Sequence, residues 1–410
     1  MTGPLASLLG VAERAITVAD LATTELWYVE PEWSAQQIAD RLQIRSFDAA
    51  PLRGDPIRRY VTLAAAEAGE GSALQLSRPI DVELVVSGAL PLTDAVAALM
   101  HQPFLFILER DRVNGMVTRA DLQRLPVSMV ALGLVIAAEA ALDVLIARFT
   151  NMEWLSLLSP KRQEGIQAVF DDRRKRNAEI TLLQCLNLDD RVTIASKLGR
   201  LRLELGHSSR KSFETWVKPI KDLRNTLAHG GGLLDAEPDP VAAAGLFQSA
   251  REFAERAWRV VEEGEQMWDV FLQTSIALDG PAGRVVLAGE DAVVDLPMPP
   301  PLHVLTGWNP GARPRSVAEN ERWNQQLWER LQAAETVTET ALGWLGSWSE
   351  PSFVVSGLST AGVVQLAREF GQVAVFELTQ DELRVIDCAY GQVRRQRARC
   401  VRSSGSTRPE

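Results

Sequence analysis

The chain has 410 residues, which at roughly 150 residues per domain predicts two or three domains. Its hydrophobic content of 46% and charged content of 23% are typical of globular proteins and exclude wholesale disorder. The formal net charge of -10 excludes a protein that binds nucleic acid over its whole surface, because phosphates would be attracted only at local basic patches. The widely spaced Cys185, Cys388 and Cys400, and a beginning without the basic segment of an export signal, favour a reduced, cytoplasmic compartment.

Residues 1–125 contain an internal repeat. In each copy a polar turn leads to a helix, at residues 34–42 and 92–100, and then to apolar strands. The second copy ends in GMVTRAD, residues 115–121, where a threonine begins a helix and an aspartate follows one turn later. This order predicts an α/β module built from two related halves.

Gly115, Thr118 and Asp121 are the candidate ligand-binding residues of this module. A hydroxyl at a helix N-terminus lies beside free N–H groups that attract phosphate, and a carboxylate one turn later can accept both ribose hydroxyls. The same residue types also occur in ordinary helix caps, so both interpretations, nucleotide binding and helix capping, stay open. The repeat and its GMVTRAD end resemble tandem CBS domains, which implies an adenine-type nucleotide as regulatory ligand. The first copy has Thr62 but no aspartate three residues later, so we expect one strong site per pair.

Helical periodicity dominates residues 126–275 and predicts an all-α bundle. The expected helices cover residues 127–149, 161–177, 190–205, 213–229 and 240–272. The first of them has the length of a membrane span, but Glu139, Asp143 and Arg148 favour a buried helix with one polar stripe. We therefore expect no membrane association.

The decapeptide KDLRNTLAHG, residues 221–230, carries Arg224, Asn225 and His229 as candidate catalytic residues. RNA supplies its own nucleophile, the 2′-hydroxyl, so an enzyme needs only to move protons and to neutralise the phosphate. An imidazole such as His229 suits the first task and a guanidinium such as Arg224 the second. Since these two lie about 140° apart on one helix, a second copy is needed to form a complete groove. The alternative is a plain helix end capped by Gly230, and the two interpretations are compatible.

This stretch resembles the R-x4-H signature of HEPN domains, including the polar residue after the arginine. The resemblance implies a metal-independent endoribonuclease that acts on RNA as a homodimer and requires no cofactor. Combined with a nucleotide sensor, it suggests a toxin or an anti-phage defence effector.

The C-terminal third begins with a linker, residues 276–301, that is expected to contain one short strand or hairpin and that ends in a proline run. Residues 302–390 alternate strands and helices and predict a small α/β domain. Its WNP, EPSF and FGQ motifs resemble the domain-of-unknown-function family 3293, a resemblance that implies no activity. Five polar residues of these motifs could line a small-ligand pocket or satisfy buried backbone groups, namely Asn309, Asn320, Arg322, Glu350 and Gln372. Residues 391–410 are basic and then rich in serine and glycine, and we expect a disordered tail.

The sequence thus predicts a multidomain protein of α/β and all-α parts: a CBS-like pair, a HEPN-like helical bundle and a C-terminal α/β domain. The favoured function is a nucleotide-regulated endoribonuclease. The alternative is a non-catalytic, nucleotide-sensing dimeric scaffold, and a third possibility is that the C-terminal domain is the enzyme.

Overall fold

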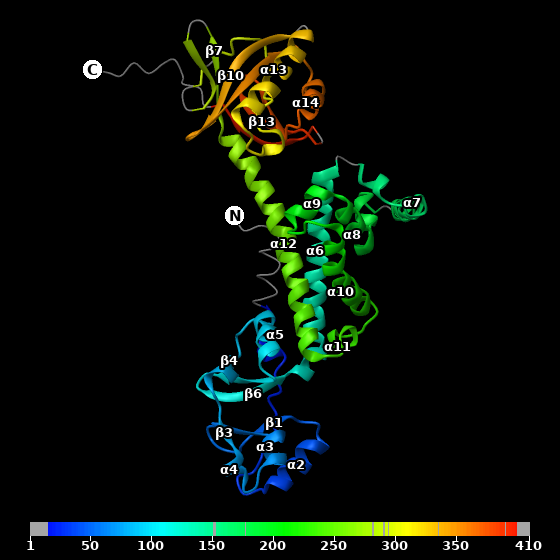
Figure 1. Cartoon of the computed structure of the whole chain (residues 1–410), viewed down its shortest axis with the longest axis vertical. Helices are drawn as coiled ribbons and strands as arrows, with labels where there is room; N and C mark the ends of the chain where they lie inside the picture. Colours follow the sequence, from blue (N-terminus) through cyan, green and yellow to red (C-terminus); the bar gives the residue numbers. More distant parts are fainter. Residues whose placement is uncertain are drawn as a thin grey trace, which may run out of the picture. The chain divides into compact units, whose positions relative to one another are not determined.

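The computed structural model (Figure 1) describes residues 15–150, 153–176, 178–280, 283–289, 292–293, 295–334, 336–389 and 391–399. The chain divides into two compact units. Unit 1 comprises Met1–Leu145 and Leu157–Arg259, and unit 2 comprises Ile146–Ser156 and Val260–Glu410. The expected sensor and bundle therefore share one unit.

The N-terminal part of unit 1 consists of two three-stranded sheets with short helices, in agreement with the predicted repeat. The first half contains α2 (Ala35–Ile44), β1 (Ala49–Pro51), β2 (Arg59–Thr62), α3 (Leu63–Ala68), α4 (Ala73–Leu76) and β3 (Arg78–Pro79). The second half contains β4 (Val85–Ser87), α5 (Leu92–His101), β5 (Phe104–Glu109), β6 (Arg112–Thr118) and the 3-10 helix η3 (Arg119–Gln123). Helix α2 begins where expected, because the Ser34 side chain accepts a hydrogen bond from the Gln37 N–H.

Aromatic packing joins the two halves into one module. The ring of Tyr60 in β2 lies 5.4 Å from that of Phe104 and 5.8 Å from that of Phe106, centroid to centroid, and both partners belong to β5. All three side chains are buried. Aromatic pairs in this range add about 0.5–1.5 kcal/mol to their burial, so the halves are fixed against each other.

The remainder of unit 1 is helical, and no strand occurs among the described residues 125–259. Its helices include α6 (Leu125–Thr150), α7 (Pro160–Lys175), α8 (Leu188–Lys197), α9 (Gly199–Glu204), α10 (Arg210–Ala228), α11 (Leu233–Ala236) and α12 (Pro240–Gln273). The single helix expected at residues 190–205 is divided at Leu198, whose backbone (φ -83°, ψ 95°) leaves the helical region. Helix α6 passes a length-and-composition test for a membrane span, and 56% of its most apolar window is buried in the fold.

A buried ion cluster fixes α8 to α6. The Arg191 guanidinium binds both carboxylate oxygens of Asp143, at 2.7 and 2.8 Å, and lies 3.7 Å from Glu139. Its side chain is only 7% exposed. Burial raises the pKa of Asp143, while Arg191 counteracts the rise. The polar stripe expected on α6 thus faces the bundle at these two carboxylates.

Unit 2 is built on an antiparallel eight-stranded sheet of order β14-β13-β12-β9-β11-β10-β7-β8. Its strands are β7 (Ser275–Gly280), β8 (Gly283–Ala288), β9 (Leu302–Leu305), β10 (Val337–Leu345), β11 (Trp348–Ser356), β12 (Ala374–Leu378), β13 (Glu382–Asp387) and β14 (Val393–Ala398). Helices α13 (Val317–Ala333) and α14 (Thr360–Glu369) pack on one face of it, around Leu327, Val363 and Phe353. Arg399, just after β14, donates to the Leu287 carbonyl in β8 at 3.0 Å, so the two ends of the sheet approach each other.

Two segments depart from the expected boundaries. Residues 276–301 were expected as a linker with one short strand or hairpin. The hairpin is present as β7 and β8, but it belongs to the domain, because β7 pairs with β10 and extends the sheet. Residues 393–398, expected in a disordered tail, form β14 against β13. Arginines are common on such strands because a charged edge opposes further pairing. The expected tail residues 401–410 lie outside the described part of the chain.

Candidate functional site

The end of α10 carries the three residues predicted for RNA cleavage. His229 is the C-cap, and its N–H donates to the Asn225 and Thr226 carbonyls at 3.2 Å each. Gly230 follows with φ +83°, the left-handed conformation that ends helices, so the capping interpretation holds. The side chains of Asn225 and His229 are both exposed. An exposed histidine beside an exposed amide remains free to meet a ligand.

Arg224 has a different environment from His229. Its Nε lies 3.4 Å from Glu139 Oε1 of α6, and its side chain is 35% exposed. Glu139 therefore lies between Arg224 and the buried Arg191, within 4 Å of each. The described contacts place Arg224 against α6 rather than with His229, as its position on the helix predicted.

Thr118 precedes the short helix η3, and Asp121 caps it from within the first turn. Asp121 Oδ2 accepts hydrogen bonds from the Thr118 N–H at 2.7 Å and from its hydroxyl at 3.0 Å, while Asp121 Oδ1 pairs with Arg124 Nε at 2.8 Å. The same cap occurs at Thr17 and Asp20, where the N–H bond is 2.7 Å and the hydroxyl bond 3.2 Å. Sequence reasoning missed this second T-x-A-D pattern, although TVAD and TRAD are visibly alike.

Gly115 occupies a position where the backbone of the preceding segment approaches closely. A Cβ atom there would lie 3.3 Å from both the Ala22 Cβ and the Thr23 carbonyl oxygen. Thr23 in turn pairs with Met116 through an antiparallel bridge. Gly115 also lines a cavity of about 410 Å³ together with Gly88 and Asn114.

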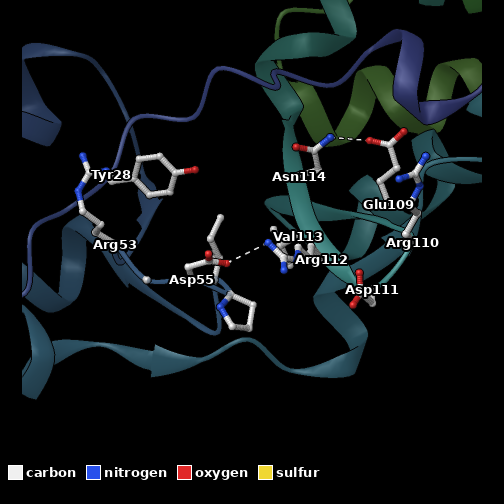
Figure 2. Close-up of a pocket in the computed structure, with 12 residues that line it drawn as sticks. Tyr28, Arg53, Asp55, Glu109, Arg110, Asp111, Arg112, Val113 and Asn114 are labelled. Carbon is white, nitrogen blue, oxygen red and sulfur yellow. Dashed lines mark hydrogen bonds and ion pairs between the residues drawn. The ribbon is translucent and has the colours of Figure 1, made fainter.

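A larger cavity of about 930 Å³ opens between the two halves of the module (Figure 2). Tyr28, Arg53 and Asp55 line it from the first half, and residues 109–114 line it from the second. Arg112 reaches across to Asp55 at 3.2 Å, and the Arg53 guanidinium lies 4.8 Å from the centre of the Tyr28 ring. Neither Thr118 nor Asp121 lines this cavity. Sequence reasoning did not single out its arginines, because they come from two turns with no motif of their own.

A cavity of about 400 Å³ lies in unit 2, and Asn309, Glu350 and Gln372 are among the residues that line it. The Asn309 amide donates to Glu350 Oε1 at 2.6 Å, and Gln372 donates to the Trp308 carbonyl at 2.9 Å. Burial raises the pKa of Glu350 to about 7, and the Asn309 hydrogen bond counteracts part of that rise. This site places a carboxyl group with a raised pKa beside an amide.

Asn320 and Arg322, the other two predicted residues, do not line the pocket. Asn320 is buried in α13 and fixes Asn309 by two hydrogen bonds: its oxygen accepts from the Asn309 N–H at 2.8 Å, and its amide donates to the Asn309 oxygen at 3.0 Å. Asn309 has the left-handed backbone (φ 47°), which those bonds stabilise. Arg322 is exposed and donates to the Ala318 carbonyl within its own helix.

The loop that carries Asn309 is seated against α13 at Gly307. A Cβ atom on Gly307 would lie 2.6 Å from the Trp323 carbonyl carbon, a distance that real contacts do not reach. The Gly307 N–H donates to Asn324 Oδ1 at 2.6 Å. Backbone contact therefore holds this loop, and the loop in turn positions one wall of the pocket.

Among the described residues, no group of three or more potential metal ligands is found.

Comparison with known proteins identifies one family. The family described as "Protein of unknown function (DUF3293)" matches residues 305–375, which confirms the resemblance stated for the C-terminal region. No curated protein matches the chain.

Solved structures similar to this chain include CBS-domain proteins. A CBS domain-containing protein of unknown function from Bacillus anthracis is 16% identical, with 27% of this chain and 91% of that chain covered and a TM-score of 0.24. CBSX2 in complex with AMP is 21% identical, covers 26% and 91%, and has a TM-score of 0.23. A conserved protein from Pyrococcus horikoshii is 13% identical, covers 27% and 90%, and has a TM-score of 0.24.

Proposed function

We propose that the N-terminal module of unit 1 binds a nucleotide and that this binding regulates RNA cleavage by the helical bundle. The observation that carries the proposal is the cavity of about 930 Å³ between the two halves of the module. Its size lies in the range of small-molecule sites, about 300–1,000 Å³. Three arginines line it, namely Arg53, Arg110 and Arg112. A ligand with phosphate groups suits these planar, permanently charged donors.

The rest of the cavity lining supports a nucleoside attached to those phosphates. Tyr28 offers an aromatic surface for a base, and the carboxylates of Asp55 and Asp111 can accept hydroxyl hydrogen bonds. Thr118, Asp121 and Gly115 do not line this cavity, so the ribose contact proposed for them would belong to a separate site beside it. For this, a ribose hydroxyl would take the place of Arg124 at Asp121 Oδ1. An adenine-type nucleotide is the ligand that we expect.

In the bundle, Arg224, Asn225 and His229 are the proposed cleavage residues. The His229 of one subunit would take the proton of the RNA 2′-hydroxyl while the 2′-oxygen attacks the phosphorus. The partner subunit's His229 would give a proton to the departing 5′-oxygen, which leaves a 2′,3′-cyclic phosphate. Arg224 would neutralise the phosphate in competition with Glu139, whose 3.4 Å contact is long for an ion pair. No metal or cofactor is required in this scheme.

Dimerisation of the bundle has support on the surface of α6. Met129 and Ile136, two turns apart, are each more than half exposed, and Leu125 is also exposed one turn earlier. Between them, Gly133 faces open space. Apolar stripes of this kind are typical of contacts with another chain. We propose a cytoplasmic homodimer that acts as a toxin or an anti-phage defence effector.

The alternative function is a non-catalytic, nucleotide-sensing dimeric scaffold. The observation that favours it is the pairing of Arg224 with Glu139, because an arginine that holds α10 to α6 needs no further role.

RNA cleavage by the purified chain, with EDTA present, separates the two functions. Wild type should cut RNA and leave cyclic or 3′-phosphate ends, and His229→Ala should not. His101→Ala, which removes another exposed histidine at the end of α5, is the matched control. If wild type does not cut under any nucleotide condition, the scaffold is the better description.

Nucleotide binding is tested separately by thermal unfolding with ATP, ADP and AMP. A ligand at a hundredfold excess over its Kd stabilises the folded state by about 2.7 kcal/mol. Arg53→Ala should reduce this shift, whereas Arg58→Ala, an exposed arginine outside the cavity lining, should not. No shift with any of the three nucleotides would contradict the sensor.

A further inference from the structure

The pocket of unit 2 has an unusual lining for its size. Aromatic and aliphatic side chains make most of its wall, including Phe271, Trp308, Trp348 and Phe376. Among the described residues that line it, Glu350 is the one ionisable side chain. The residues that line the pocket come from four parts of the chain: the end of α12, the loop 306–314, the β10–β11 hairpin and β12. The pocket therefore combines an apolar enclosure with a single carboxyl group.

A second polar group of the pocket is the buried hydroxyl of Thr274. This side chain is 1% exposed, and its hydroxyl has no hydrogen-bond partner among the described residues. Thr274 lines both the main pocket and a small adjoining cavity of about 30 Å³ that also reaches Glu350 and Thr306. A volume of that order holds about one water molecule. Since buried hydroxyls are nearly always paired, Thr274 offers a ligand or water in the pocket a hydrogen-bonding group.

Charge complementarity decides the class of ligand. No described lysine or arginine lines the pocket, so an anionic ligand would face Glu350 without a counter-charge. A cation would gain the carboxylate as its partner and the faces of the aromatic rings as an additional attractive surface. An uncharged apolar ligand would fill the same space but leave the carboxyl group buried without a charged partner.

We propose that this pocket binds a small organic cation, an aromatic body with a protonated amine. The ammonium group would contact Glu350, with Asn309 holding that carboxylate in place by its 2.6 Å hydrogen bond. Two tryptophans, Trp308 and Trp348, supply the aromatic surface for the ring of the ligand. The site is independent of RNA cleavage and of nucleotide binding in unit 1.

Binding of such a cation would be coupled to a proton. Burial raises the pKa of Glu350 to about 7, so part of the unliganded protein carries the neutral acid at neutral pH. An ammonium ion favours the carboxylate and would release that proton. The affinity for the cation should therefore rise with pH from about 5 to about 8, since the competing proton is lost over this range.

Isothermal titration calorimetry of the full chain with three indole probes tests the proposal. Tryptamine is a cation, tryptophol replaces its amine by a hydroxyl, and indole-3-acetate is an anion. Tryptamine should bind at least about tenfold more tightly than tryptophol, because hydrogen bonds to charged groups are worth about 1.5–3 kcal/mol and 1.4 kcal/mol is a tenfold change. Indole-3-acetate should bind most weakly.

Two variants locate the effect. Glu350→Gln should reduce the affinity for tryptamine to that for tryptophol and remove its pH dependence, while Glu339→Gln, an exposed carboxyl of β10 in the same unit, should change neither. The proposal is overturned if no probe binds at millimolar concentration, if tryptophol or indole-3-acetate binds as tightly as tryptamine to wild type, or if the preference for tryptamine survives in Glu350→Gln. Because wild type alone gives the order of the probes, a variant that fails to fold does not remove the test.

Discussion

Replacing Glu350 by glutamine should stabilise unit 2 in a pH-dependent way. Burial raises the pKa of this carboxyl from 4.5 to about 7. The difference is about 2.5 pKa units, and at about 1.4 kcal/mol per unit it corresponds to about 3 kcal/mol. Because the folded state holds the proton more tightly than the unfolded state, the stability that this group contributes is complete below pH 4.5. It is lost as the pH rises through about 7.

Glutamine is neutral at every pH and still accepts the hydrogen bond from Asn309, so the variant should escape this loss. Hydrogen exchange of the β11 amides, compared between wild type and Glu350→Gln at the same pH, measures the local free energy of opening. Intrinsic exchange rates and all other titrations cancel in that comparison. The variant should gain about 3 kcal/mol relative to wild type between about pH 4 and about pH 8. An equal difference at both pH values would refute the assigned cost of burying the carboxylate.

Three further predictions concern unit 1. His229→Ala should abolish RNA cleavage but change the free energy of unfolding by less than about 0.5 kcal/mol, since the side chain is exposed; a large loss of stability would make the histidine a structural residue. Arg191→Met leaves the largely buried Asp143 without its guanidinium, although Glu139 keeps Arg224, and should cost about 3–5 kcal/mol in urea unfolding. Because loss of Arg191 raises the pKa of Asp143 further, this deficit should shrink as the pH falls, and a constant deficit would argue against the ion pair. The cleavage rate per chain should fall on dilution, and a monomer with full activity would exclude a site shared between two copies.

The helical bundle could be predicted from the sequence because its signal is long and periodic. Helices of two turns or more keep the same apolar face over many residues, and tertiary contacts rarely reverse that pattern. The break at Leu198 could not be predicted, since it depends on one backbone angle in an otherwise helical segment. The strand at residues 393–398 was missed, and the hairpin expected within residues 276–301 was not predicted to join the sheet, for a related reason. Short strands at the end of a sheet are determined by the neighbour they pair with, here β10 and β13.

The C-terminal pocket was predictable in its polar residues but not in its walls. Asn309, Glu350 and Gln372 stand in recognisable motifs, and the structure brings them together over 41 and 22 positions of sequence. Phe271 and Thr274 come from the end of a helix that the sequence assigns to the bundle, and only the folded chain shows that they line the same pocket. The cavity of the N-terminal module was missed entirely. The arginines of this cavity lie in turns, and the amino-acid composition of a turn says little about where its side chains lie in the fold.

The contact at Gly307 bears on how relatives of this C-terminal domain are recognised. With the helix backbone 2.6 Å from the position of a Cβ, any larger residue would push the WNP loop away from α13. In this chain the glycine before the WNP motif therefore meets a steric requirement, and we expect relatives with the same loop geometry to need glycine there. A homologous sequence that keeps WNP but replaces this glycine should have a differently shaped pocket, and ligand specificity should not be transferred to it from this protein.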